Sequence, residues 1–201
     1  MNVLEIRKLG CAVAAAGLFA AASGGALAQG VKNSINLAVG ALPPIGDANA
    51  TVLMVEYERL VGSKVSVFAR GSSLKYKWDD GDYVEDGKGT GVGVGMRFFP
   101  QGGLKGFYIG AAVASFDSKW DWTEKSPVGS GKGTTKSIQW GGEVGYRFNL
   151  GSERVSLTPA FNFGSWLGGD DTCSNSSGSP CTKESELGFY AAISLALGIA
   201  F

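Results

Sequence analysis

The stretch Ser137–Leu150, SIQWGGEVGYRFNL, decides the fold, because its side chains alternate in character at every second position. One face carries Ile138, Trp140, Val144, Tyr146, Phe148 and Leu150, with Gly142 among them. The other face carries Ser137, Gln139, Gly141, Glu143, Gly145, Arg147 and Asn149. A period of two over about 14 residues is typical of a β-strand and excludes an α-helix.

The last segment of the chain, 186–201, repeats this alternation at similar length. Such runs exceed the ~5–6 residues of an ordinary soluble strand and match the ~9–11 residues of a tilted strand that crosses a membrane. One face of each run is small or polar, where a soluble sandwich would place its large core residues. The pattern is therefore that of an outer-membrane barrel, in which the apolar face meets lipid and the polar face points inward.

Eight such runs are expected, at 34–42, 51–60, 63–71, 89–99, 106–118, 136–149, 154–167 and 185–201. The connections after the second, fourth and sixth runs are short, while those after the third, fifth and seventh (72–88, 119–135 and 168–184) are long and polar. Short turns on the periplasmic side and long loops outside are the topology of bacterial outer-membrane barrels. The sequence thus predicts an all-β, eight-stranded antiparallel up-and-down transmembrane β-barrel with both termini on the periplasmic side.

The N-terminal segment 1–28 has the features of a secretory signal peptide. Arg7 and Lys8 precede an apolar run, and Ala26-Leu27-Ala28 offers small residues for cleavage after Ala28. The alternative is a membrane anchor, but the run of about 14 residues is shorter than the ~20 that a spanning helix needs. Cys11 precedes the apolar run and would leave with the signal, so the mature barrel domain is expected at 29–201.

Exposed backbone groups are too costly in hydrocarbon for an open sheet edge, so the first and last strands are expected to pair. An eight-stranded barrel is just wide enough for side chains to fill. Strand parity points six charged side chains into this lumen: Glu56, Glu58, Arg70, Arg97, Glu143 and Arg147. We expect a neutralising network that plugs the lumen, with Glu143 reaching Arg147 four residues away or sharing a neighbour with it. The alternative is a gate or a selective ion path.

Cys173 and Cys181 remain in the mature chain, and an even count in an exported protein favours a disulfide. A zinc site is the alternative, but two thiols without any histidine are a poor ligand set. No cofactor and no metal site are predicted. The 18 basic and 18 acidic residues balance, which gives no indication of a nucleic-acid partner.

Aromatic residues gather near the expected strand ends, which predicts girdles at the two membrane interfaces. The periplasmic set is Tyr57, Phe98, Phe99, Phe107, Tyr108, Tyr146, Phe148 and Phe201, and the outer set is Trp140 and Trp166, with Trp120 and Trp122 beyond it. Gly91, Gly93 and Gly95 are expected to make room for long inward side chains such as Arg97. Pro159 cannot donate a ladder hydrogen bond and predicts a bulge or local irregularity.

The signal segment, the eight alternating runs and the aromatic end LGIAF at 197–201 together resemble the small outer-membrane β-barrel families, including OmpA-like, OmpX-like and OmpW-like proteins. The resemblance covers the mature chain. It implies that Phe201 acts as a C-terminal assembly signal, that the barrel-assembly machinery is a partner during biogenesis, and that outer-membrane lipids surround the protein. MRFFP at 96–100 followed by GFYIG at 106–110 also resembles an uncharacterised barrel family of unknown function, but no catalytic or binding residue follows from it.

Enzymes of this architecture use a serine with histidine, and this chain has no histidine. The sequence therefore predicts a non-enzymatic outer-membrane component that supports the envelope or contacts the surroundings. The alternative is a narrow pore for ions or small molecules. Two further hypotheses are adhesion through the loops, with Trp78, Tyr83, Trp120 and Trp122 as contact residues, and an outer-membrane enzyme. Nothing in the sequence predicts the oligomeric state.

Overall fold

The computed structural model describes residues 31–45, 48–125, 128–151, 154–167, 171–180 and 188–201. Its strands are β1 (Asn33–Ile45), β2 (Ala48–Leu60), β3 (Val65–Asp79), β4 (Tyr83–Phe98), β5 (Gly106–Lys125), β6 (Val128–Asn149), β7 (Val155–Leu167), β8 (Asp171–Asn175) and β9 (Phe189–Ala200). The expected signal segment 1–28 lies outside the described residues. Within the described residues, no helix is long and apolar enough to cross a membrane.

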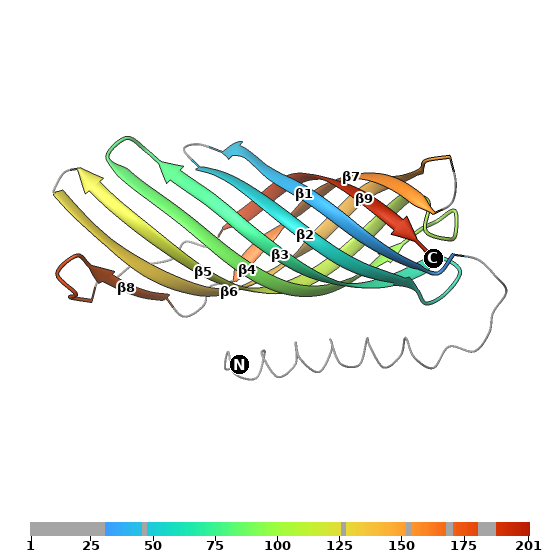
Figure 1. Cartoon of the computed structure of the whole chain (residues 1–201), viewed down its shortest axis with the longest axis horizontal. Coiled ribbons are helices and arrows are strands. Elements are labelled where there is room, and N and C mark those ends of the chain that lie inside the picture. The colour runs from blue at the N-terminus through green and yellow to red at the C-terminus, as the bar shows by residue number, and fades with distance from the viewer. Residues whose placement is uncertain (1–30, 46–47, 126–127, 152–153, 168–170, 181–187) are drawn as a thin grey trace.

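Eight of these strands close into a ring of antiparallel neighbours, β1-β2-β3-β4-β5-β6-β7-β9, in which β9 pairs back onto β1 (Figure 1). The short strand β8 pairs with the part of β6 that projects beyond β7. Figure 1 shows the strands inclined to the long axis, with the C-terminus at the end opposite the tips of the β3–β4 and β5–β6 hairpins. The predicted eight-stranded antiparallel barrel is confirmed.

The outer face of the ring is apolar and the inner face is polar. Leu37, Val55, Val92 and Ile193 are at least half exposed on the outside. Ser34, Asn36, Ser66 and Ser194 are buried on the inside. This inversion of a soluble barrel fits a wall that meets hydrocarbon with one face and encloses a polar lumen with the other.

Strands β3 to β6 are longer than the sequence predicted, and the expected loops 72–88 and 119–135 are largely strand. Pairing continues outward along them, for example from Lys75 to Lys88 and from Lys88 to Lys119. The expectation was wrong because the wall leaves the apolar belt at this level. Polar residues then occupy its outer face as well, and the alternation of hydropathy fades while the backbone ladder persists. We call 75–88, 117–125 and 128–136, together with β8, the outer extension.

Glycines on the inner face lie opposite aromatic residues of the next strand. Gly95 pairs with Phe68, Gly91 with Phe116, and Gly145 with Tyr108. A Cβ at Gly95 would lie 2.3 Å from the ring of Phe68, and one at Gly145 would lie 2.5 Å from the Tyr108 hydroxyl. The glycines do make room, as predicted, but Gly91 and Gly95 make it for flat-lying rings rather than for Arg97. This arrangement is the aromatic cover of glycine that also pins strand register.

The expected girdles are correct for the residues that point outward and wrong for five others. Tyr57, Phe98, Phe107, Tyr146, Phe148, Phe201 and Trp140 are exposed on the outer face. Phe99, Tyr108 and Trp120 are buried, and Trp166 packs against the buried residues of the lumen. Trp122 is half-buried, and its Nε1 is fully buried. These five have the parity of inward residues, and parity decides orientation even at a strand end.

Pro159 interrupts one ladder without a bulge. It faces Leu195 of β9, whereas the β6–β7 pairing stops at Gly145 and resumes at Phe148 in the same register. The missing proline N–H therefore costs local hydrogen bonding but leaves the strand alignment intact.

Candidate functional site

Four strands deliver the six charged residues predicted to point inward to one level of the lumen. Glu56 and Glu58 come from β2, Arg70 from β3, Arg97 from β4, and Glu143 and Arg147 from β6. Glu56 lies directly opposite Arg70 in the β2–β3 register. Arg97 and Glu143 lie opposite the same residue of β5, Gly110, which has no side chain to separate them. The barrel thus brings together all six residues, which we call the ion cluster.

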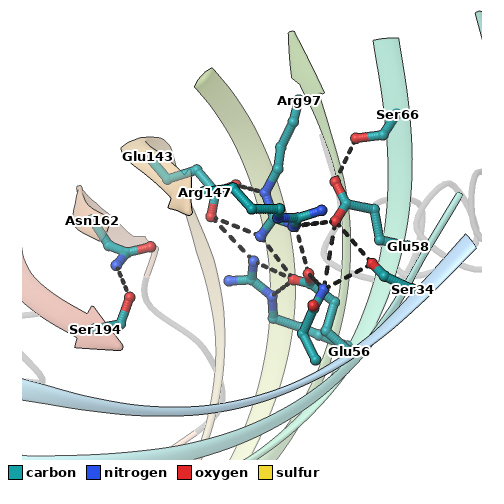
Figure 2. Close-up of polar contacts among 11 residues, drawn as sticks. Ser34, Glu56, Glu58, Ser66, Arg97, Glu143, Arg147, Asn162 and Ser194 are labelled. Atoms are coloured by element: carbon teal, nitrogen blue, oxygen red, sulfur yellow. Dashed lines mark hydrogen bonds and ion pairs between the residues drawn. The ribbon is translucent and has the colours of Figure 1, made fainter. Parts of the chain in front are cut away.

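Each carboxylate of the ion cluster contacts two arginines. Arg97 reaches Glu56 at 2.5 Å and Glu58 at 3.1 Å, and its Nε donates to Glu143. Arg70 reaches Glu56 at 2.8 Å and Glu143 at 3.2 Å. Arg147 reaches Glu58 at 2.5 Å. Figure 2 shows the Arg97 side chain between Glu143 on one side and Glu56 and Glu58 on the other.

The ion cluster is buried and electrically balanced. Its side chains range from 0% exposed at Glu58 to 14% at Arg70. Ionised groups this deep need partners, because an unpaired one costs about 3–5 kcal/mol. Smaller polar residues add bonds: Ser66 donates to Glu58 at 2.6 Å and Asn36 donates to Glu56 at 3.0 Å.

Aromatic rings hold the arginines from the side. The guanidinium carbons of Arg70 and Arg97 lie 4.4 and 4.3 Å from the centre of the Phe68 ring. Arg97 also lies 5.1 Å from the Tyr108 ring. These cation–π contacts fix the guanidinium planes without competing for hydrogen bonds.

An apolar cap closes the lumen at the short-turn end, next to the ion cluster. It consists of Phe99, Leu104 and Tyr108, which are at most 8% exposed, with Leu60 and Ala160 packed against them. The Phe99 and Tyr108 rings lie 5.2 Å apart. Phe99 is anchored through its backbone, which donates to the Lys64 carbonyl at 2.7 Å. An ion that entered from this end would have to pass the apolar side chains of the cap before it reached the ion cluster.

A second apolar group crosses the lumen on the other side of the ion cluster. We call this group the roof: Leu74, Ala114 and Phe116, with Ala50, Val52, Tyr76 and Trp166 against them. Phe116 meets Trp166 edge-on with ring centres 5.0 Å apart. Between the roof and the ion cluster lies a cavity of about 80 Å³.

A smaller cavity of about 30 Å³ lies beside the ion cluster, toward the β1, β7 and β9 wall. Three buried polar atoms around it have no hydrogen-bond partner within the described residues: Asn36 Oδ1, Arg147 Nε and Thr158 Oγ1. A cavity of this size with such a lining suits one or two bridging waters. The lumen is therefore tightly packed at the ion cluster but not solid.

Among the residues that the structure describes, the predicted contact between Glu143 and Arg147, direct or through a shared neighbour, is not present. Arg147 pairs with Glu58 across the lumen, while Glu143 pairs with Arg97 and Arg70, so the two β6 residues have separate partners. Sequence reasoning missed the cap, the roof and the supporting serine and asparagine. Strand parity was the signal for all of them except Leu104, since the others lie on inward positions, whereas Leu104 lies in the turn between β4 and β5.

Two other expected sites lie away from the lumen. Cys173 lies on β8 opposite Gly133 and is disulfide-bonded, but Cys181 lies outside the described residues, so the pairing stays a prediction. Phe201 is exposed at the end of β9, and its role in assembly likewise stays a prediction. Among the described residues, no three His, Cys, Asp or Glu side chains gather as a metal-binding group.

A closed ring of eight antiparallel strands, an apolar outer belt and a charge-filled lumen define the class: the chain has the fold of the small outer-membrane β-barrels. No family model and no curated protein sequence matches it. Among solved structures it is similar to Ail, the attachment invasion locus protein of Yersinia pestis, with a TM-score of 0.51 and 11% identity over 85% of this chain and 97% of that chain. It is also similar to the translocator domain of the autotransporter NalP from Neisseria meningitidis, with a TM-score of 0.50 and 9% identity over 97% of this chain and 98% of that chain. At these identities the similarity concerns the fold alone.

Proposed function

We propose that this protein is a non-enzymatic outer-membrane barrel whose lumen is closed to ions. In this proposal the protein contacts other molecules through the outer extension. The observation that carries the proposal is the series of obstacles along the lumen: the cap, the ion cluster and the roof. A hydrated ion would have to break paired charges and cross two apolar layers. Each step is costly in a low-dielectric interior.

The carboxylates of the lumen support the non-enzymatic part. Glu56, Glu58 and Glu143 are each engaged by two arginines. A general base needs a free lone pair aimed at a substrate, whereas these groups are committed to holding cations in place.

The outer extension supports the surface role. It carries parts of β3 to β6 together with β8 beyond the apolar belt, and its inward side bears aromatic and acidic residues held in place. Tyr76 and Tyr83 both donate to Glu85, at 2.8 and 2.7 Å, and Tyr83 stacks on Trp122 with ring centres 6.2 Å apart. Rigid aromatic residues of this kind are frequent contact residues in interfaces. In this proposal the barrel is exported, with cleavage after Ala28, and is inserted by the barrel-assembly machinery.

A narrow pore is the second candidate, and the smaller cavity favours it. That cavity shares Met54, Arg70, Glu143, Asn162 and Ser194 with the larger one, so the two follow one another past the ion cluster. Rearrangement of a few side chains would join them into a narrow passage along the β7–β9 wall.

Planar-bilayer recording of the refolded mature chain separates the two candidates. We expect the wild type to be silent. The double variant Arg97→Ser/Glu143→Ser removes one charge of each sign and leaves Glu56–Arg70 and Glu58–Arg147 paired. We expect this variant to conduct more than the wild type does. Lys88→Ser on the outer face is the matched control. Steady single-channel steps from the wild type would overturn the closed-lumen proposal in favour of the pore.

A further inference from the structure

The cavity between the ion cluster and the roof has the features of a ligand site. Its volume of about 80 Å³ compares with the ~10–15 Å³ that one water needs, so it holds several waters or one ring-sized molecule. It lies deeper than the outer extension, because Gly40, Val52, Leu74 and Phe116 line it on the side away from the cap.

Its walls are mostly apolar. The larger surfaces are provided by Val52, Met54, Leu74, Phe116 and Trp166. On β5, the small side chain of Ala112 leaves space in the cavity. Water in a site with this lining lacks partners on most sides, so a molecule with an apolar body would displace it favourably.

Three of the lining residues carry polar groups that are not used in hydrogen bonds among the described residues. Arg70 uses Nε and Nη2 for Glu56 and Glu143, and its Nη1 has no partner among the described residues. Gln139 and Tyr190 also line the cavity, and the Gln139 amide and the Tyr190 hydroxyl have no hydrogen-bond partner in the described part of the chain. None of these groups is among the fully buried polar atoms that lack a partner, so each keeps some accessible surface. Arg70 and Gln139 can both donate to a ligand oxygen.

The charge of the ion cluster determines which ligand fits. Three glutamates already balance three arginines beside the cavity. An anion would add unbalanced charge in a low-dielectric site, and a cation would meet the Arg70 guanidinium. We propose that this cavity binds a small uncharged molecule with an apolar ring-sized body and one acceptor oxygen, which receives a hydrogen bond from Arg70 Nη1.

Three probes with one body test this proposal: para-fluorobenzyl alcohol, para-fluorobenzoate and para-fluorobenzylamine. Binding is followed by fluorine NMR with the refolded mature chain in nanodiscs, and empty nanodiscs correct for partition into lipid. Ala112→Leu fills the cavity from β5. Ala111→Leu makes the same change one position away, on the exposed outer face, and is the matched control. Retained heat-modifiable mobility on gels verifies that both variants are folded.

We expect saturable binding of the alcohol to the wild type and to Ala111→Leu, a loss of at least tenfold in affinity in Ala112→Leu, and no saturable binding of the charged probes. Equal binding to the two variants would place the alcohol outside the cavity and overturn the proposal. Preferential binding of the benzoate or the amine would overturn the uncharged class, and no saturable binding of any probe would leave a water-filled space and no ligand site. These outcomes are independent of the conductance experiment, because a closed lumen permits either result.

Discussion

The backbones of Asn33 and Phe201, 168 positions apart, are joined in both directions: Asn33 donates to the Phe201 carbonyl at 3.0 Å, and Phe201 donates to the Asn33 carbonyl at 2.9 Å. This pair ends the β1–β9 seam that closes the barrel. The C-terminal residue therefore has a structural contact through its backbone, whereas its ring points outward and the residue as a whole is 58% exposed.

Phe201→Ala separates these two roles. The backbone contacts remain, so we expect the refolded barrel to lose little stability in urea titrations. If the ring is an assembly signal, the amount of folded protein in outer-membrane fractions falls severalfold. Phe189→Ala, an exposed phenylalanine at the other end of β9, is the control. Equal accumulation of the two variants in cells would count against the signal.

Gly95→Ala tests the pairing of glycine with aromatic rings. The added methyl group would lie 2.3 Å from the Phe68 ring and 2.4 Å from the Ala111 carbonyl oxygen. We expect a loss of about 1–3 kcal/mol in the free energy of unfolding, as for other overpacked sites. Gly71→Ala, which meets nothing within 4 Å, should be neutral or slightly stabilising. A similar effect of both substitutions in urea titrations would contradict the steric explanation.

Glu58→Gln tests the energetic coupling of the ion cluster. Glu58 is fully buried and is the carboxylate that contacts Arg147, so its neutralisation leaves a buried cation without compensation. We expect a destabilisation of about 3–5 kcal/mol. Glu58→Gln/Arg147→Gln removes both charges and should recover part of that loss. A double-mutant cycle from urea titrations measures the coupling, and additive single effects would show that the pair is not coupled.

The phenol of Tyr83 provides a prediction about alkaline pH. Burial and the hydrogen bond to the Glu85 carboxylate raise the pKa of Tyr83 above its ordinary value. Because the folded state favours the protonated phenol, this contribution to stability is complete below the ordinary pKa of ~10 and is lost as the pH rises through the folded-state pKa. In Glu85→Gln we expect phenolate absorbance to appear at lower pH than in the wild type. Asp86→Asn, on the outer face of the same strand, should leave the titration unchanged.

The expected Cys173–Cys181 bridge is tested by thiol counting. Export through an oxidising compartment favours the bridge, so the denatured, unreduced mature chain should bind no thiol reagent and the reduced chain should bind two equivalents. Reduction should leave the barrel folded, because β8 pairs only with the projecting part of β6 among the described strands. Labelling of the unreduced chain would rule out the bridge.

The sequence by itself determined the fold class and the direction of each side chain in the wall. Alternation in stretches such as Ser137–Leu150 depends only on which side of one strand faces hydrocarbon, so it is visible without knowledge of any partner strand. It placed the six charged residues inside the barrel. The same alternation also indicates that Phe99 and Tyr108 point inward. The girdle prediction overlooked this because it considered only how near each aromatic residue lies to the end of its strand.

The tertiary structure alone decided which inward groups meet. Glu143 and Arg147 are four residues apart on β6, yet Arg147 pairs with Glu58, 89 positions away, because closure of the ring brings β2 and β6 face to face across a narrow lumen. The lengths of β3 to β6 were also decided at this level, since strand pairing continues where the hydropathy signal ends. Alternation is a property of one strand and its two environments, whereas contacts across a lumen depend on the register of every strand around the ring.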